Sequence, residues 1–95
     1  MTPETALKRQ IRDYLRLKGW FVFHVLQGLG AYRGISDMIA LKAGRVVFLE
    51  VKSPRGKQNE NQRKFQQDVE DHGGEYWLVK SLDDVIEREK VGEDV

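Results

Sequence analysis

The chain has 95 residues and a mass of 11.0 kDa, which is enough for a single domain (residues 1–95) but not for two independent hydrophobic cores. Apolar residues make up 40% and charged residues 33%, a mixture that excludes intrinsic disorder and fibrous proteins. The sequence contains no membrane-spanning run, no signal-peptide core and no cysteine, which excludes disulfide scaffolds, thiolate zinc sites and cysteine nucleophiles. We therefore expect a cytoplasmic location.

The charges are unevenly distributed along the chain. There are 16 basic and 15 acidic residues, for a net charge of +1. Residues 87–95 form an acidic tail with four acidic and two basic residues, so residues 1–86 carry a net charge of +3. A metal bound by some of the acidic residues would make the outward field more positive still. This balance permits a polyanionic partner without requiring one.

The N-terminal segment is predicted to be an amphipathic helix. Thr2 can cap its start, Pro3 suits the first turn, and apolar residues recur at helical spacing until Gly19 ends the run. Glu4 falls on this apolar stripe. The opposite, solvent-facing side is predicted to be basic, with Lys8, Arg9, Arg12 and Arg16.

Strands and one further pair of helices are predicted after residue 19. Residues 20–26 are aromatic and β-branched, residues 27–34 form a loop with three glycines, and residues 37–42 and 45–52 form a hairpin. A basic loop at residues 53–57 leads to a second helix from Asn59 to Gly73, a strand at 75–79 and a short helix at about 81–90. This order is typical of an α/β domain whose sheet lies between helices.

Charged residues interrupt the predicted hairpin where apolar residues are expected. Alternation places Asp37 on the face of Ile39, and Glu50 and Lys52 together on the face of Phe48. Charges at the end of a mostly buried strand need partners or a metal. Taken alone, Glu-x-Lys on a strand is most often an ordinary salt bridge.

A metal site becomes the stronger interpretation because two further carboxylates are directed to the same place. Asp37 lies on the neighbouring hairpin strand, and Glu4 lies on the inward stripe of the first helix. Three carboxylates beside one lysine suit Mg²⁺, which binds carboxylates, waters and phosphate oxygens.

These residues also resemble a known signature. Gly34-Ile35-Ser36-Asp37, then a twelve-residue gap, then Glu50-Val51-Lys52 is similar to the PD-(D/E)xK nuclease motif, with Ser36 in place of its proline. The glycine-rich approach to Asp37, the run from Phe48 to Pro54 and Gln62 in the next helix resemble a stand-alone, virus-type VRR-NUC domain over residues 4–79. The resemblance implies a restriction-endonuclease-like core, αβββαβ with a short C-terminal helix and a mixed sheet between helices.

The resemblance also implies a role for each matching residue at the metal. Asp37 and Glu50 would ligate Mg²⁺ or Mn²⁺, the Val51 carbonyl would add an oxygen, and Glu4 would reach the metal directly or through water. Lys52 would orient or activate the attacking water and steady the phosphate.

Gln62 has two alternative interpretations. The resemblance places it in the metal site, and its position three residues before Phe65 puts it on the inward stripe of its helix. With equal weight, it could be the capping-box partner of Asn59, and the two roles could compete.

Four residues in two loops are candidates for contact with DNA: Tyr32, Arg33, Arg55 and Lys57. For each of them, an ordinary solvated loop position has nearly the same weight. We expect His24 to be a core or edge histidine rather than a general base, and the basic side of the first helix to be solvated rather than to track DNA.

The resemblance implies a metal-dependent endonuclease that hydrolyses phosphodiesters in branched DNA, in particular a Holliday-junction resolvase, suited to a virus or mobile element. A two-fold symmetric junction needs paired incisions, so we expect a homodimer, with residues 20–23 or Trp77 as interface candidates unless they are core. The alternatives are a nickase or restriction-like nuclease without preference for branches, and a non-catalytic module that binds branched DNA.

Overall fold

The structure is a computed structural model that describes residues 1–93. Its elements are α1 (Pro3–Leu17), β1 (Phe21–His24), β2 (Met38–Lys42), β3 (Arg45–Val51), α2 (Glu60–Asp71), β4 (Glu75–Val79) and α3 (Leu82–Glu93). The predicted order of elements is confirmed, while several boundaries shift. β1 is shorter than expected, and Asp37 and Lys52 lie directly outside β2 and β3 instead of inside them.

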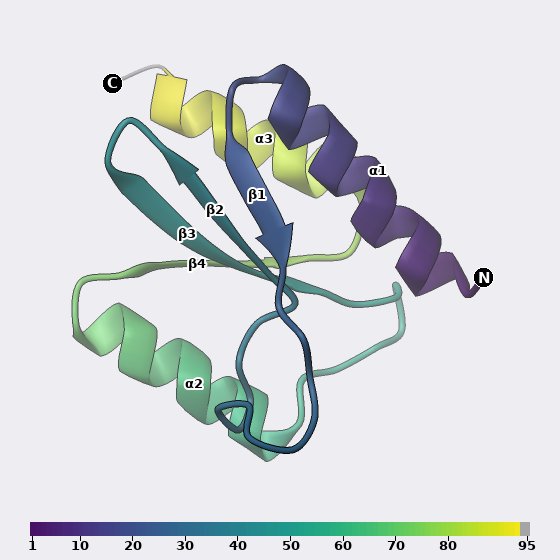
Figure 1. Cartoon of the computed structure of the whole chain (residues 1–95), viewed down its shortest axis with the longest axis vertical. Helices are drawn as coiled ribbons and strands as arrows, with labels where there is room; N and C mark the ends of the chain where they lie inside the picture. The colour runs from purple at the N-terminus through teal and green to yellow at the C-terminus, as the bar shows by residue number, and fades with distance from the viewer. Residues whose placement is uncertain (94–95) are drawn as a thin grey trace.

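The four strands form one mixed sheet in the order β1-β2-β3-β4. β2 pairs antiparallel with both β1 and β3, whereas β3 and β4 run parallel. Helices α1 and α3 pack against one another on one side of the sheet, and α2 lies on the other side (Figure 1). The predicted fold class, a mixed sheet between helices, is therefore confirmed.

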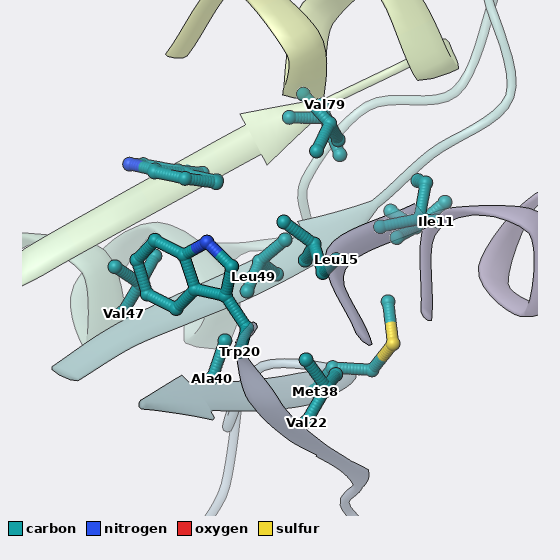
Figure 2. Close-up of a cluster of buried hydrophobic side chains, with 12 residues drawn as sticks. Ile11, Leu15, Trp20, Val22, Met38, Ala40, Val47, Leu49 and Val79 are labelled. Carbon is teal, nitrogen blue, oxygen red and sulfur yellow. The ribbon is translucent and has the colours of Figure 1, made fainter. Parts of the chain in front are cut away.

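The main hydrophobic core lies between the sheet and the α1–α3 layer. Figure 2 shows Ile11 and Leu15 of α1 beside strand residues such as Met38 and Leu49. Burial of each large apolar side chain contributes about 1.5–3 kcal/mol. The buried members are Ile11, Leu15, Trp20, Val22, Met38, Ala40, Val47, Leu49, Val51, Trp77, Val79 and Val85.

Two tryptophans considered for a dimer interface belong to this core. Trp20 and Trp77 are buried, and their rings meet edge to face with centroids 5.9 Å apart. The neighbouring Phe21 and Phe23 behave differently, since their side chains are 65% and 39% exposed and their ring centroids lie 5.4 Å apart. Within the predicted interface segment, only these two phenylalanines are therefore available at the surface.

A smaller aromatic cluster packs beneath α2. The ring of Phe65 lies 5.5 Å from that of Phe48, 5.9 Å from that of Tyr32 and 6.1 Å from that of Tyr76, measured between centroids. Because Val47, Leu49 and Val51 face the opposite core, alternation turns Phe48 and Glu50 toward α2. This second face of β3 is the one that carries the predicted site.

The acidic tail is not a separate solvated segment over most of its length. Helix α3 continues to Glu93, and Glu89 is buried with 1% exposure. Glu89 follows Leu82, Val85 and Ile86 at helical spacing, which indicates that its side chain faces inward. The tail's last residues, Asp94 and Val95, lie outside the described residues.

The glycine-rich loop between β1 and β2 docks against the start of α2. Gly34 has φ of 79°, and a β-carbon at this position would overlap the backbone of Asn61. Only glycine can therefore occupy position 34 at this distance from α2.

Over residues 1–93, no helix has both the length and the apolar composition needed to cross a lipid bilayer.

Candidate active site

Three of the four residues predicted for the metal site meet at the carboxyl end of β3: Asp37, Glu50 and Val51. Glu50 is only 1% exposed, and the β2–β3 register places Asp37 across from it. Asp37 Oδ2 accepts a hydrogen bond from the backbone N–H of Val51 at 2.8 Å. The β3 backbone therefore fixes the Asp37 carboxylate beside Glu50, as the alternation of the hairpin predicts.

The two carboxylate oxygens of Glu50 have different surroundings. Oε1 accepts a hydrogen bond from Gln62 Nε2 at 3.0 Å and lies 3.7 Å from Lys52 Nζ. Oε2 is buried, and no group in residues 1–93 forms a hydrogen bond with it. A buried carboxylate oxygen without a partner is costly, and a bound cation would offset that cost.

The electrostatics of the pair also fit a cation. Burial, together with the nearby Asp37 carboxylate, raises the pKa of Glu50 to about 8, although the positive charge of Lys52 opposes this rise. Two adjacent carboxylates that repel each other in a partly dry site are stabilised by a divalent ion. A divalent cation such as Mg²⁺ or Mn²⁺ would satisfy the unpartnered oxygen and relieve the repulsion that helps to raise the pKa.

Gln62 caps α2 and contacts Glu50 at the same time. Its Oε1 accepts a hydrogen bond from the Asn59 backbone N–H, and Asn59 Oδ1 accepts one from the Gln62 N–H, each at 2.9 Å. This capping box leaves the amide Nε2 free to donate to Glu50. The roles do not compete, because they use opposite ends of the amide.

Glu4 does not join the carboxylate pair. Lys8 Nζ lies 3.1 Å from Asp37 Oδ1 and 3.9 Å from Glu4 Oε1, so Lys8 stands between the two acids. Within the described part of the chain, no group of three or more acidic or histidine side chains is close enough to hold a metal. The expectation that three carboxylates converge is therefore wrong.

Lys8 was expected on the solvent-facing side of the first helix, and this prediction is wrong. It is half-buried, not on the solvent side. A signal was present, because Lys8 lies four residues after Glu4 and three before Ile11 and so borders the apolar stripe.

The turn before Asp37 depends on side chains that no motif marked. Gln27 Nε2 donates to the carbonyls of Ile35 and Ser36, each at 3.2 Å. Ser36, in the place of the motif's proline, is buried, and its hydroxyl donates to the Met38 carbonyl at 3.1 Å. These bonds shape the turn, and Gln27 carried no sequence signal.

The four candidate DNA contacts lie on two surface loops. Tyr32 is 63% exposed, and with Arg33 it lines a cavity of about 520 Å³ against α2. Arg55 and Lys57 are exposed in the loop that Lys52 opens. One loop leads into Asp37 and the other follows Glu50, so both adjoin the carboxylate pair along the chain.

Comparison with known proteins settles the architecture. No protein-family profile and no curated protein sequence matches the chain. A solved structure described as "VRR_NUC domain" superposes with a TM-score of 0.80 at 24% sequence identity, covering 92% of this chain and 97% of that chain. This chain has the VRR_NUC fold. The resemblance stated from the sequence is confirmed at the level of the fold, and the VRR_NUC fold extends over nearly all of both chains.

Proposed function

We propose that this protein is a metal-dependent endonuclease that hydrolyses DNA phosphodiester bonds. The observation that carries the proposal is the buried Glu50 carboxylate beside Asp37: its Oε1 lies 3.7 Å from the Lys52 amine, and its Oε2 has no hydrogen-bond partner among residues 1–93. An ordinary structural salt bridge does not need the second carboxylate. The likeness to a VRR_NUC domain supports the same conclusion through the fold.

Asp37 and Glu50 would hold Mg²⁺ or Mn²⁺, with the Val51 carbonyl as a further oxygen. When bound, the ion supplies positive charge that stabilises a phosphodiester during hydrolysis. Because the pKa of Glu50 is about 8 without metal, the carboxylate pair retains a proton at neutral pH. Metal binding therefore releases a proton and becomes tighter as the pH rises.

Lys52 and Gln62 have distinct tasks beside the carboxylates. The Lys52 amine is mostly buried near Glu50 Oε1 and would donate to the attacking water or to a phosphate oxygen. Gln62 fixes the rotation of the Glu50 carboxylate through its amide. Catalysis then depends on positioning and charge stabilisation, with water attacking in line.

The substrate we propose is branched DNA, in particular a four-way junction, cut by a homodimer. A two-fold symmetric junction requires two incisions, and each 11.0 kDa chain carries one carboxylate pair. The exposed Phe21 and Phe23 support a second copy as partner, because α2 contacts β4 and leaves the face over β1 open.

The proposal is tested by incubating labelled four-way junction, duplex and single strand with the protein in Mg²⁺, Mn²⁺ or EDTA. Lys52→Ala runs beside the wild type. We expect symmetric, metal-dependent nicking of the junction by the wild type alone. Equal cutting of plain duplex would mean that the protein is a nuclease, a nickase or restriction-like enzyme, without a preference for junctions.

One contact favours a second candidate, a non-catalytic module that binds branched DNA. Lys8 pairs with the Asp37 oxygen that a metal would need, at 3.1 Å. If neither protein cuts any substrate while both bind the junction, this second candidate replaces the first.

A further inference from the structure

A basic pocket lies between α1 and the edge strand β1. Its volume is about 350 Å³, and it is lined by Thr5, Lys8, Arg9, Arg12 and His24. The α1 members share one side of the helix because they are three or four residues apart. His24 lies on the same side of β1 as Val22, which is packed in the core beneath α1.

The pocket has an excess of positive charge. Lys8 is paired with Asp37, and Arg12 Nε lies 3.0 Å from Asp13 Oδ1. Arg9 forms no ion pair with any carboxylate of residues 1–93, and its guanidinium lies 3.9 Å from the sulfur of Met1. At least one arginine is therefore free to bind an anion.

The pKa of His24 is affected by the same positive charges. Burial lowers the pKa of its imidazole, and the positive charges of four side chains lower it further: Arg12, Lys8, Arg16 and Arg9. The four side-chain charges that lower this pKa are all positive.

The pocket adjoins the carboxylate pair through a single side chain. Lys8 lines the pocket, and its Nζ lies 3.1 Å from Asp37 Oδ1. An anion in the pocket would thus be separated from the site of Asp37 and Glu50 by one lysine. Arg55 and Lys57 follow Glu50 in a different loop, so they do not contribute to this pocket.

We propose that this pocket binds a backbone phosphate of the DNA strand, next to the phosphodiester that is cleaved. The Arg9 and Arg12 guanidinium groups, the Thr5 hydroxyl and the His24 imidazole are donors suited to phosphate oxygens. Such contacts are independent of base sequence and set the register of the strand. The assignment rests on the proposed function only in taking DNA as the substrate.

The first test observes the pocket without cleavage. The chain contains two histidines, His24 and His72, and the second lies at the end of α2 with its Nδ1 2.6 Å from the Asp68 carbonyl. Thymidylyl-thymidine, which contains one phosphodiester, is titrated into metal-free protein in EDTA while the imidazole proton resonances are followed by NMR. We expect a saturable shift of the His24 signals and none of the His72 signals.

Two arginine variants make this test specific. Arg9→Gln should weaken the His24 response at least about tenfold, as expected for the loss of one charged hydrogen bond. Arg88→Gln is the matched control, because Arg88 is an exposed arginine of α3 that lines a different cavity with Glu75 and Trp77. An unmoved His24 signal, or equal weakening by both variants, would overturn the proposal.

The second test uses the salt dependence of DNA binding. Binding of labelled junction in EDTA is measured over a range of salt concentrations, and Arg9→Gln should reduce the slope of log K against log salt by about 0.9, as expected for one duplex phosphate contact. An unchanged slope contradicts the assignment. Cleavage is scored separately: a saturable His24 shift without cleavage rejects only the nuclease, and cleavage with a silent His24 rejects only the pocket.

Discussion

Each end of the sheet buries a glutamate beside a lysine, yet only one of the two pairs looks like an active site. Glu50 and Lys52 lie at the carboxyl end of β3, and Glu89 of α3 meets Lys42 at the other end of the hairpin. In both pairs the nitrogen lies 3.7 Å from the carboxylate, and the glutamate is 1% exposed. Neither Oε2 has a hydrogen-bond partner among the described residues.

The difference is the second carboxylate. Glu50 has the Asp37 carboxylate beside it, which helps to raise its pKa. The further charge that interacts with Glu89 is Arg45, which is itself paired with Glu75. A buried glutamate–lysine pair is thus no evidence of a metal site by itself, and the second carboxylate is what makes one.

The largest expected effect comes from removing either carboxylate of the first pair. Asp37→Asn or Glu50→Gln should lower the cleavage rate at least about 10³-fold, because several kcal/mol of metal-dependent stabilisation is lost. Glu89→Gln is the matched control and should cleave at the wild-type rate. Rates are measured on labelled junction in Mg²⁺, and normal cleavage by Asp37→Asn would reject the metal assignment.

Substitutions of the two lysines should also have different effects: Lys52 is needed for cleavage, and Lys42 contributes only to stability. Lys52→Ala should abolish turnover while calorimetry still detects metal binding, because the amine acts on water or phosphate and not on the ion. Lys42→Ala should retain cleavage but lower the free energy of unfolding by about 1–2 kcal/mol, since Glu89 loses a half-exposed partner. Loss of metal affinity in Lys52→Ala would instead assign that lysine a structural role.

An intermediate effect is expected at the amide that orients Glu50. Gln62→Ala should lower cleavage about 10–100-fold and the free energy of unfolding by about 1 kcal/mol, because it removes both the contact with Glu50 and half of the capping box. Asn59→Ala removes a cap bond alone and should cost similar stability with little loss of activity. Equal activity losses in the two variants would show that the cap, not the Glu50 contact, matters.

The last expected effect is a pH dependence of stability at the Glu50 pair. Its pKa is raised in the folded state, so Glu50 favours folding at pH values below its usual pKa and this contribution is lost as pH rises toward about 8. Without metal, the melting temperature of Glu50→Gln should therefore rise progressively relative to that of wild type as the pH increases from 5 to 8. Thermal unfolding in EDTA tests this, and a constant difference across the range would contradict it.

Periodicity predicted most of the fold, because the glycine stops and the switch between helical and alternating patterns are local properties. The Asp37–Glu50 pair followed from strand alternation for the same reason. Lys8 was misplaced because it borders an apolar stripe, where packing decides whether a charge faces water. Gln27 was missed because it bonds to backbone eight and nine residues away, which no local pattern encodes.

The contact between Gly34 and the backbone of Asn61 makes the glycine-rich loop and the first turn of α2 one cooperative unit. The loop cannot lift while α2 stays in place without losing this close packing, so amide protons of both segments should exchange with the same opening free energy. That unit contains Tyr32 and Arg33 at its surface and Gln62 at its inner side. DNA bound to the loop would therefore also slow the local unfolding of the α2 turn that carries Gln62, whose side-chain amide donates to Glu50.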